Sequence, residues 1–185
     1  MTETPSRDTP AEPTVTLLRL KTGAAPKLGQ HAHGAIHYEL LADTNRQTLL
    51  LRLTGNDGGG NHSLELVPFS RLQAIVAGLP PDSRVPSRVF RSSFRGRSQN
   101  NAGFCCLALR AEGLLFPVEG KRYQHKVAGD WENWATQTLA LTGEPVELPV
   151  TLVGDALPVD TPAPLPVRRG KRKTQPEEAE DACPA

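Results

Sequence analysis

The sequence predicts an α+β protein in which a small antiparallel sheet comes first and helices with a basic hairpin follow. Two observations support this fold class. Short runs rich in strand-forming residues fill the first part of the chain, separated by Asp, Asn, Thr and Gly, which favour turns. From residue 69 onward, apolar residues recur with helical spacing instead. The predicted strands are 15–20, 36–41, 48–53 and 63–67.

This change of period also divides the chain. We expect a β-rich part over 14–67 and a helical part over 68–153, which together can form one compact domain. The two ends, 1–13 and 154–185, are rich in proline and charge and poor in apolar residues. Both ends are therefore expected to be disordered tails.

Three helices and a hairpin are expected after residue 68. In the third helix, one face is expected to carry Phe104, Leu107, Ala108 and Ala111. Gly113 suits the position after this helix, because glycine adopts the left-handed conformation without strain. The helices are predicted at 69–79, 86–95 and 99–112, and the hairpin at 114–128.

A helix, a glycine stop and a basic hairpin in this order resemble the recognition helix and wing of winged-helix DNA-binding domains. The two preceding helices complete the element order of such a unit over residues 69–128. The resemblance implies that the start of the helix at 99–112 enters the major groove of DNA. It also implies that the hairpin contacts the DNA backbone.

An arginine-rich stretch, 86–95, is expected to be helical. As a helix it brings Phe90 and Phe94 together. As a strand it would point alternate residues to opposite sides and divide the arginines. The helix instead gathers three of them on a second face, namely Arg88, Arg91 and Arg95.

The chain also has an alternative fold. If 85–97 and 103–111 were strands, the second half would repeat the order of the first. The chain would then be a tandem ββββα protein, similar to the Whirly and Pur-type single-strand-binding folds. We prefer the helical interpretation, because the run Ala-Leu-Arg-Ala-Glu consists mainly of strong helix formers.

A further helix and a final extended segment are expected after the hairpin. Asp130 suits the N-cap position, since its carboxylate can accept hydrogen bonds from exposed backbone amides. Trp131 and Trp134 then begin an apolar face. This helix is predicted to stop at Gly143, and the extended segment covers 146–153.

Charge is unevenly distributed along the chain. Between Arg84 and Lys126, nine basic and two acidic residues give a net charge of +7, while the whole 185-residue chain carries +1. Such a local excess within one structural unit is typical of proteins that contact phosphates. Most of these basic residues are arginines, which suits bidentate binding of phosphate or guanine.

The predicted nucleic-acid-binding site combines phosphate contacts and base contacts. The arginine stripe and the hairpin are expected to contact phosphates. Ser98, Gln99 and Asn100 are candidates for base contacts, because amide side chains pair with adenine edges. Helix capping is the ordinary role of such residues. The full set is Arg88, Arg91, Arg95, Arg97, Ser98, Gln99, Asn100, Lys121, Arg122 and Lys126.

Other chemistry has weaker support in the sequence. The run HAHGAIHYE at 31–39 places three histidines and a glutamate on one side of a strand, but its spacing matches no zinc signature. A polar strand face is the preferred interpretation. Cys105 and Cys106 are expected to pack as small hydrophobic residues. No nucleophile motif is recognised, and neither a cofactor nor a metal is predicted.

The sequence therefore predicts a DNA-binding protein without catalytic activity, either a regulator or an accessory factor of bacterial type in DNA replication or transfer. Its expected partner is duplex or single-stranded DNA, and a homodimer is left open. Without a membrane-spanning run or a signal-peptide pattern, we expect no membrane partner and a cytosolic location. Two other functions stay open: single-strand binding of the Whirly or Pur type, and docking of a protein partner.

Overall fold

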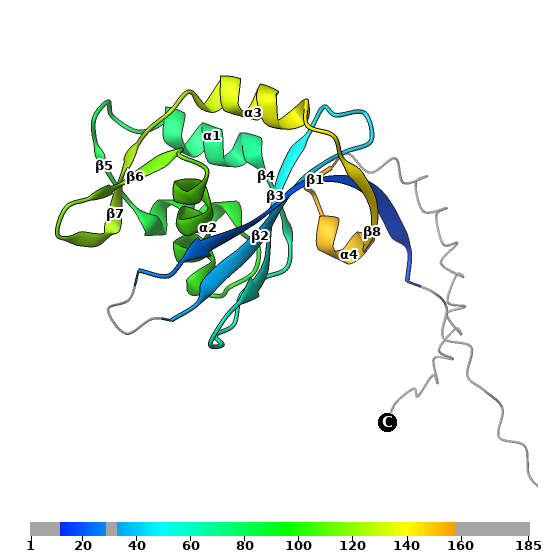
Figure 1. The fold of residues 1–185 in the computed structure, drawn as a ribbon, viewed down its shortest axis with the longest axis horizontal. Coiled ribbons are helices and arrows are strands. Elements are labelled where there is room, and N and C mark those ends of the chain that lie inside the picture. The colour runs from blue at the N-terminus through cyan, green and yellow to red at the C-terminus, as the bar shows by residue number, and fades with distance from the viewer. Residues whose placement is uncertain (1–11, 29–32, 158–185) are drawn as a thin grey trace, which may run out of the picture.

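The computed structural model describes residues 12–28 and 33–157 of the chain. They form a mixed α+β fold, as the sequence predicts, built on a curled five-stranded antiparallel sheet (Figure 1). The strands of this sheet are β1 (Thr14–Pro26), β2 (Ala35–Ala42), β3 (Leu49–Asn56), β4 (Leu66–Pro68) and β8 (Glu144–Pro149). Their order is β4-β3-β2-β1-β8, so the last strand of the chain pairs with the first.

The strands predicted in the first part of the chain are present, with two clear differences in length. Strand β1 continues to Pro26, six residues beyond the predicted end at Leu20, because residues 21–26 pair with β2 instead of forming a loop. Strand β4 begins at Leu66, so residues 63–65 of the predicted strand lie in the preceding loop. The turn between β2 and β3 is fixed by Asp43. Its carbonyl accepts a hydrogen bond from the Arg46 amide at 2.9 Å, and its carboxylate accepts one from the Thr48 amide at 2.5 Å.

Helices and a second sheet complete the described part of the chain. The helices are α1 (Phe69–Ala77), the 3-10 helix η1 (Ser87–Ser93), α2 (Asn100–Ala111), α3 (Trp131–Leu139) and the short α4 (Val150–Val153). The second sheet is antiparallel and contains β5 (Arg84–Pro86), β6 (Leu115–Val118) and β7 (Lys121–Val127), in the order β5-β7-β6. Among the described residues, no helix has the length and apolar character needed to cross a membrane.

The arginine-rich stretch differs from the helix expected over 86–95. Its first residue, Pro86, belongs to β5, where it pairs with Gln124 of β7. The helix that follows is a short 3-10 helix rather than an α-helix, and Phe94 returns to an extended backbone with φ of −106° and ψ of 138°. Arg95 therefore lies outside the helix. The tandem ββββα alternative is wrong, since the second of its required strands lies within the α2 helix.

The end of α2 follows the prediction. Gly113 has a φ of +75°, which favours glycine. Its amide donates to the Arg110 carbonyl at 3.0 Å, and the amide of Leu114 donates to the Leu109 carbonyl at 2.9 Å. These two hydrogen bonds satisfy carbonyls at the end of the helix and direct the chain into β6.

The start of α3 is also as expected, but its end is not. The carboxylate of Asp130 accepts a hydrogen bond from the Asn133 amide at 3.0 Å and so caps the helix. The helix ends at Leu139, before the predicted stop at Gly143. There, Nη1 of Arg46 donates to the Leu139 carbonyl at 2.5 Å. The extended segment predicted at 146–153 likewise ends early, where α4 begins.

Apolar residues cover both faces of the five-stranded sheet. The larger cluster joins the sheet to α1, α2 and α3, and within it Phe69 stacks on Trp131 with ring centroids 5.4 Å apart. The smaller cluster lies under α4 and includes Ala156, which is 5% exposed. The Asp155 carboxylate lies 2.6 Å from Arg71. Packed structure therefore continues into the predicted C-terminal tail; most of both predicted tails lies outside the described residues.

Candidate nucleic-acid interface

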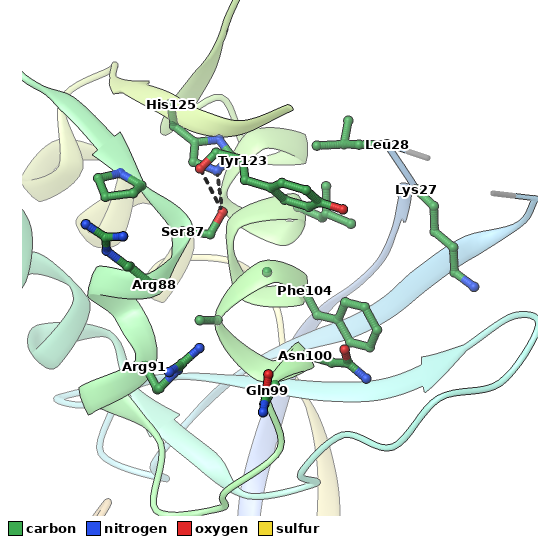
Figure 2. A pocket seen from close by; sticks show the side chains of 14 residues that line it. Lys27, Leu28, Ser87, Arg88, Arg91, Gln99, Asn100, Phe104, Tyr123 and His125 are labelled. Atoms are coloured by element: carbon green, nitrogen blue, oxygen red, sulfur yellow. Dashed lines mark hydrogen bonds between the residues drawn. The ribbon is translucent and has the colours of Figure 1, made fainter. Parts of the chain in front are cut away.

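A groove lies between η1, the first turns of α2 and strand β7, beside the end of β1 (Figure 2). Its cavity volume is about 580 Å³. We call it the η1–α2 groove. Four of the predicted site residues line it, namely Arg88, Arg91, Gln99 and Asn100. The other six do not: Arg95, Arg97, Ser98, Lys121, Arg122 and Lys126.

The lining residues that the sequence analysis did not propose include Lys27, Phe104 and Tyr123. Lys27 follows β1, far away in sequence, and no local pattern connects it with η1. Phe104 was assigned to the core face of α2, but it is only partly buried and lines the groove. Tyr123 lies in the predicted hairpin and is 65% exposed. Of these three residues, only Tyr123 had a sequence signal, namely an aromatic residue within a basic hairpin.

The two arginines of η1 lie on the same side of the helix. A 3-10 helix has about three residues per turn, so Arg88 and Arg91 are eclipsed. Both are exposed, and neither forms an ion pair with the described residues. Phe90 is fully buried and anchors η1 in the core. The fold therefore presents these two cations to solvent on a fixed helix.

Arg95 has a different role from the other two arginines of the predicted stripe. Its Nε lies 3.3 Å from Oε2 of Glu65 and 3.8 Å from Asp155. The backbone amides of Arg95 and Gly96 also donate to Glu65, at 2.9 and 2.8 Å. Burial alone would raise the pKa of Glu65, but hydrogen bonds from Ser63 and from these amides lower it overall. Glu65 thus holds the loop that leads into α2 through hydrogen bonds and an ion pair.

The start of α2 is tied to the glycine-rich loop after β3. Oγ of Ser98 and Nδ2 of Asn100 both donate to the Asn61 carbonyl, at 2.6 and 3.0 Å. Gln99 is exposed, and its side chain makes no capping hydrogen bond. Of the three residues proposed for base contacts, Ser98 and Asn100 therefore hold the helix start in place. The side chain of Gln99 does not cap the helix.

Helix α2 belongs to the core. Seven of its twelve residues are buried, and it packs against β1 and β2 as well as η1 and β6. Burial raises the pKa of the thiols of Cys105 and Cys106, to about 12 for Cys106, so both stay protonated at neutral pH. They pack as small hydrophobic residues, as expected. The exposed residues of this helix are Asn100 at its start and Ala111 at its end.

The second sheet carries basic residues on its outer side. His125 faces inward opposite Val85, and both are buried. Lys126 lies opposite Arg84 on one neighbouring strand and opposite Phe116 on the other, and all three are exposed. The remaining two hairpin cations, Lys121 and Arg122, are exposed at the start of β7, next to the turn.

Ser87 and His125 lie together at the groove. Oγ of Ser87 is 2.8 Å from Nε2 of His125 and 3.4 Å from the Tyr123 carbonyl. Burial, together with the positive charge of Arg110, lowers the pKa of His125 to about 4, so its ring is neutral at neutral pH. The contact between the two side chains connects η1 with β7 at the edge of the groove.

The polar run in β2 lies on the face of the five-stranded sheet that is turned away from α1, α2 and α3. This face, which we call the outer face, also carries the smaller apolar cluster. Nε2 of His37 is 2.9 Å from Oδ1 of Asp57. Glu39 lies 3.6 Å from Arg19 and 3.4 Å from Arg52. The first two residues of the run lie outside the described residues. Within the described ranges, no three His, Cys, Asp or Glu side chains are placed together as metal ligands would be.

The fold and the groove together define an α+β protein with a cationic, aromatic-lined groove beside a small basic sheet. No family model, curated protein or solved structure matches the chain. The functional argument therefore depends on the geometry and charge of this site.

Proposed function

We propose that this protein binds DNA without catalysing a reaction, as a regulator or an accessory factor in DNA replication or transfer. The observation that carries the proposal is a set of exposed basic side chains at the groove, on the second sheet and in the loop before α2. Within the described structure, none of them forms an ion pair. Phosphates of a bound polyanion would supply the missing negative charge. The set is Arg84, Arg88, Arg91, Arg97, Lys121, Arg122 and Lys126.

One pair within this set supports the proposal directly. Arg84 and Lys126 lie opposite each other on neighbouring strands. Like charges in this arrangement destabilise a sheet. A phosphate bound between the two side chains would neutralise this repulsion. The pair would therefore favour binding of an anion, although it does not favour folding.

The order of elements also supports a winged-helix-like unit. From α1 the chain continues through β5, η1, α2, β6 and β7, and the hairpin is joined by β5 in one sheet. The departure from such a unit is the burial of α2. We therefore propose that DNA contacts the rim of the groove through η1 and the hairpin, and that α2 contributes only its first turn.

A binding titration tests the proposal. The full chain is titrated by fluorescence anisotropy against a labelled duplex and a single strand of the same sequence, at about 50 and about 200 mM salt. We expect binding that weakens steeply with salt, by about 0.9 in the log–log slope for each phosphate contact on duplex DNA. If neither DNA binds at the lower salt concentration, the DNA proposal is wrong, and the basic surface serves a protein partner instead.

Single-strand binding is the second candidate function. It no longer depends on the tandem fold of the Whirly and Pur types, which the chain does not have. It is favoured by Tyr123, whose ring is 65% exposed among basic residues, because stacking on aromatic side chains is the common way of holding unpaired bases. The same titration compares the two forms of DNA.

A further inference from the structure

We infer that the η1–α2 groove holds one unpaired nucleotide of a bound DNA strand. The inference rests on the proposed DNA binding and specifies the contact made at the groove. Aromatic rings and cations border one cavity, and a nucleotide offers the complementary parts, an aromatic base and an anionic phosphate. These lining side chains are Phe104, Tyr123, Lys27, Arg88 and Arg91 (Figure 2).

Tyr123 is the side chain that most clearly requires a partner. Its ring is 65% exposed, and in Figure 2 it extends from β7 toward the side where Lys27 lies. Base stacking on an aromatic ring is favourable for every base type. Within a duplex, however, neighbouring base pairs already cover both faces of each base. The ring can therefore stack only on a base that is unpaired or has left the helix.

The size of the cavity agrees with this occupant. A volume of about 580 Å³ lies within the roughly 300–1,000 Å³ that small-molecule sites occupy. It can admit one nucleotide but not a double helix. The rings of Phe104 and Tyr123 come from α2 and β7, two elements that are held in the fold independently of any ligand.

Amides at the rim supply contacts for the edge of the base. Gln99 is exposed at the start of α2 and lines this cavity together with Asn100. Nδ2 of Asn100 is occupied by the Asn61 carbonyl, so its Oδ1 is oriented as an acceptor. An unpaired base exposes its Watson–Crick edge to such donors and acceptors.

Cations at the same cavity supply contacts for the phosphate. Arg88 and Arg91 share one side of η1, and Lys27 borders the cavity from the end of β1, where its Nζ donates to the Asp57 carbonyl. Among the residues that the structure describes, no carboxylate lines the cavity. The charge of the site therefore matches a nucleotide better than an uncharged aromatic ligand.

The test uses two DNA hairpins with the same stem. In one, 2-aminopurine is a single unpaired nucleotide at the 3′ end; in the other, it is paired within the stem. We expect the wild type to bind the first hairpin roughly 5- to 150-fold more tightly, the range that corresponds to stacking of one base. We also expect quenching of the unpaired 2-aminopurine, because stacking on tyrosine changes its fluorescence.

Three variants assign the effect to the groove. Tyr123→Ala should abolish both the preference and the quenching, so that this variant binds the two hairpins equally. Tyr123→Phe keeps the ring and should retain both effects. Phe116→Ala is the matched control, since this residue is 58% exposed on the outer side of the second sheet, and it should change neither effect.

The outcomes separate the inference from the function that it extends. Equal binding of both hairpins without quenching would overturn the groove assignment and leave DNA binding intact. No binding of either hairpin would overturn both. At the protein concentration that saturates the hairpin, free 2-aminopurine nucleotide should not be quenched, because it lacks the stem contacts. Its quenching there would assign the groove to free nucleotides instead of a DNA strand.

Discussion

His125 is a titratable residue whose ionisation is controlled by the fold. It is 1% exposed, and burial, with the charge of Arg110, lowers its pKa to about 4, from an ordinary value near 6.5. As the pH falls from about 6.5, the unfolded chain binds a proton at this position, while the folded chain does not until about pH 4. The contribution of His125 to the free energy of unfolding is thus complete above about pH 6.5 and is lost as the pH falls from there to about 4.

We predict that the titration of this residue lowers the free energy of unfolding by about 2 kcal/mol as the pH falls from about 7 to about 5. The variant His125→Gln should be less stable at pH 7 but should lose less stability over the same interval. Urea unfolding at the two pH values measures this. His33→Gln, at an exposed position, should retain the full decline. An equal decline in His125→Gln would assign the pH dependence to other groups.

Arg91 and Arg95 test whether the arginines have separate tasks. Arg91 is unpaired in the described structure and borders the groove, whereas Arg95 contacts Glu65 at 3.3 Å. Arg91→Ala should leave the melting temperature unchanged and reduce the salt slope of DNA binding by about one unit. Arg95→Ala should lower the melting temperature and change the slope little. A uniform loss of slope in both variants would show that the stripe predicted from the sequence acts as one phosphate-binding unit.

At the scale of elements, what could be predicted depended on the range of the signal. The glycine at the end of α2 and the Asp130 cap are local signals, and both were predicted correctly. The 3-10 form of η1 was not, because it depends on the pairing of Val85 with His125 across a long sequence distance. The groove was missed in part for the same reason: Lys27 reaches it only through the end of β1.

The burial of α2 was also beyond the sequence pattern. Its apolar face was assigned to Phe104, Leu107, Ala108 and Ala111, yet Phe104 is only partly buried and Ala111 is exposed. The helix is covered on more than one side because the five-stranded sheet and the η1–hairpin unit both pack on it. A single sequence shows which residues are apolar, but not that two surfaces meet at one helix.

Two glycines of this region should respond oppositely to the same added methyl group. Neither Gly103 nor Gly113 has an atom within 4 Å of the position that a Cβ would occupy, but Gly113 has a φ of +75°. Gly113→Ala should destabilise by roughly 1–2 kcal/mol through backbone strain. Gly103→Ala, within the helix, should stabilise by roughly 0.5–1 kcal/mol. Urea unfolding measures the change in the free energy of unfolding for both variants. Equal destabilisation by the two substitutions would show that packing around the added methyl groups, and not the backbone conformation, decides the effect.

At the scale of the whole molecule, the first strand of the five-stranded sheet pairs with the strand that comes last in the described chain. Thr14 of β1 pairs with Pro149 of β8, which places both ends of the sheet-forming chain side by side. The larger apolar cluster takes side chains from both the β-rich part and the helical part that the sequence distinguishes. The residues after α4 then pack beneath the other face of the sheet, with Ala156 buried.

We predict that a shortened chain of residues 12–157 keeps the melting temperature of the full chain. A chain ending at residue 153 should be destabilised by roughly 1–2 kcal/mol, mostly through lost apolar burial at Ala156 and Leu157. The exposed pair Arg71–Asp155 should contribute little. Thermal unfolding compares the three chains. A lower melting temperature for the 12–157 chain would show that a terminal segment stabilises the fold.

The central claim is that DNA lies over the η1–α2 groove and the adjoining basic hairpin. The most direct measurement is an amide chemical-shift map of the full chain, recorded by NMR during titration with DNA. The claim predicts shifts centred on Arg88, Arg91, Gln99 and Tyr123, with little change at Arg19 and Arg52 on the outer face of the five-stranded sheet. Shifts centred on that outer face, with an unchanged groove, would contradict it.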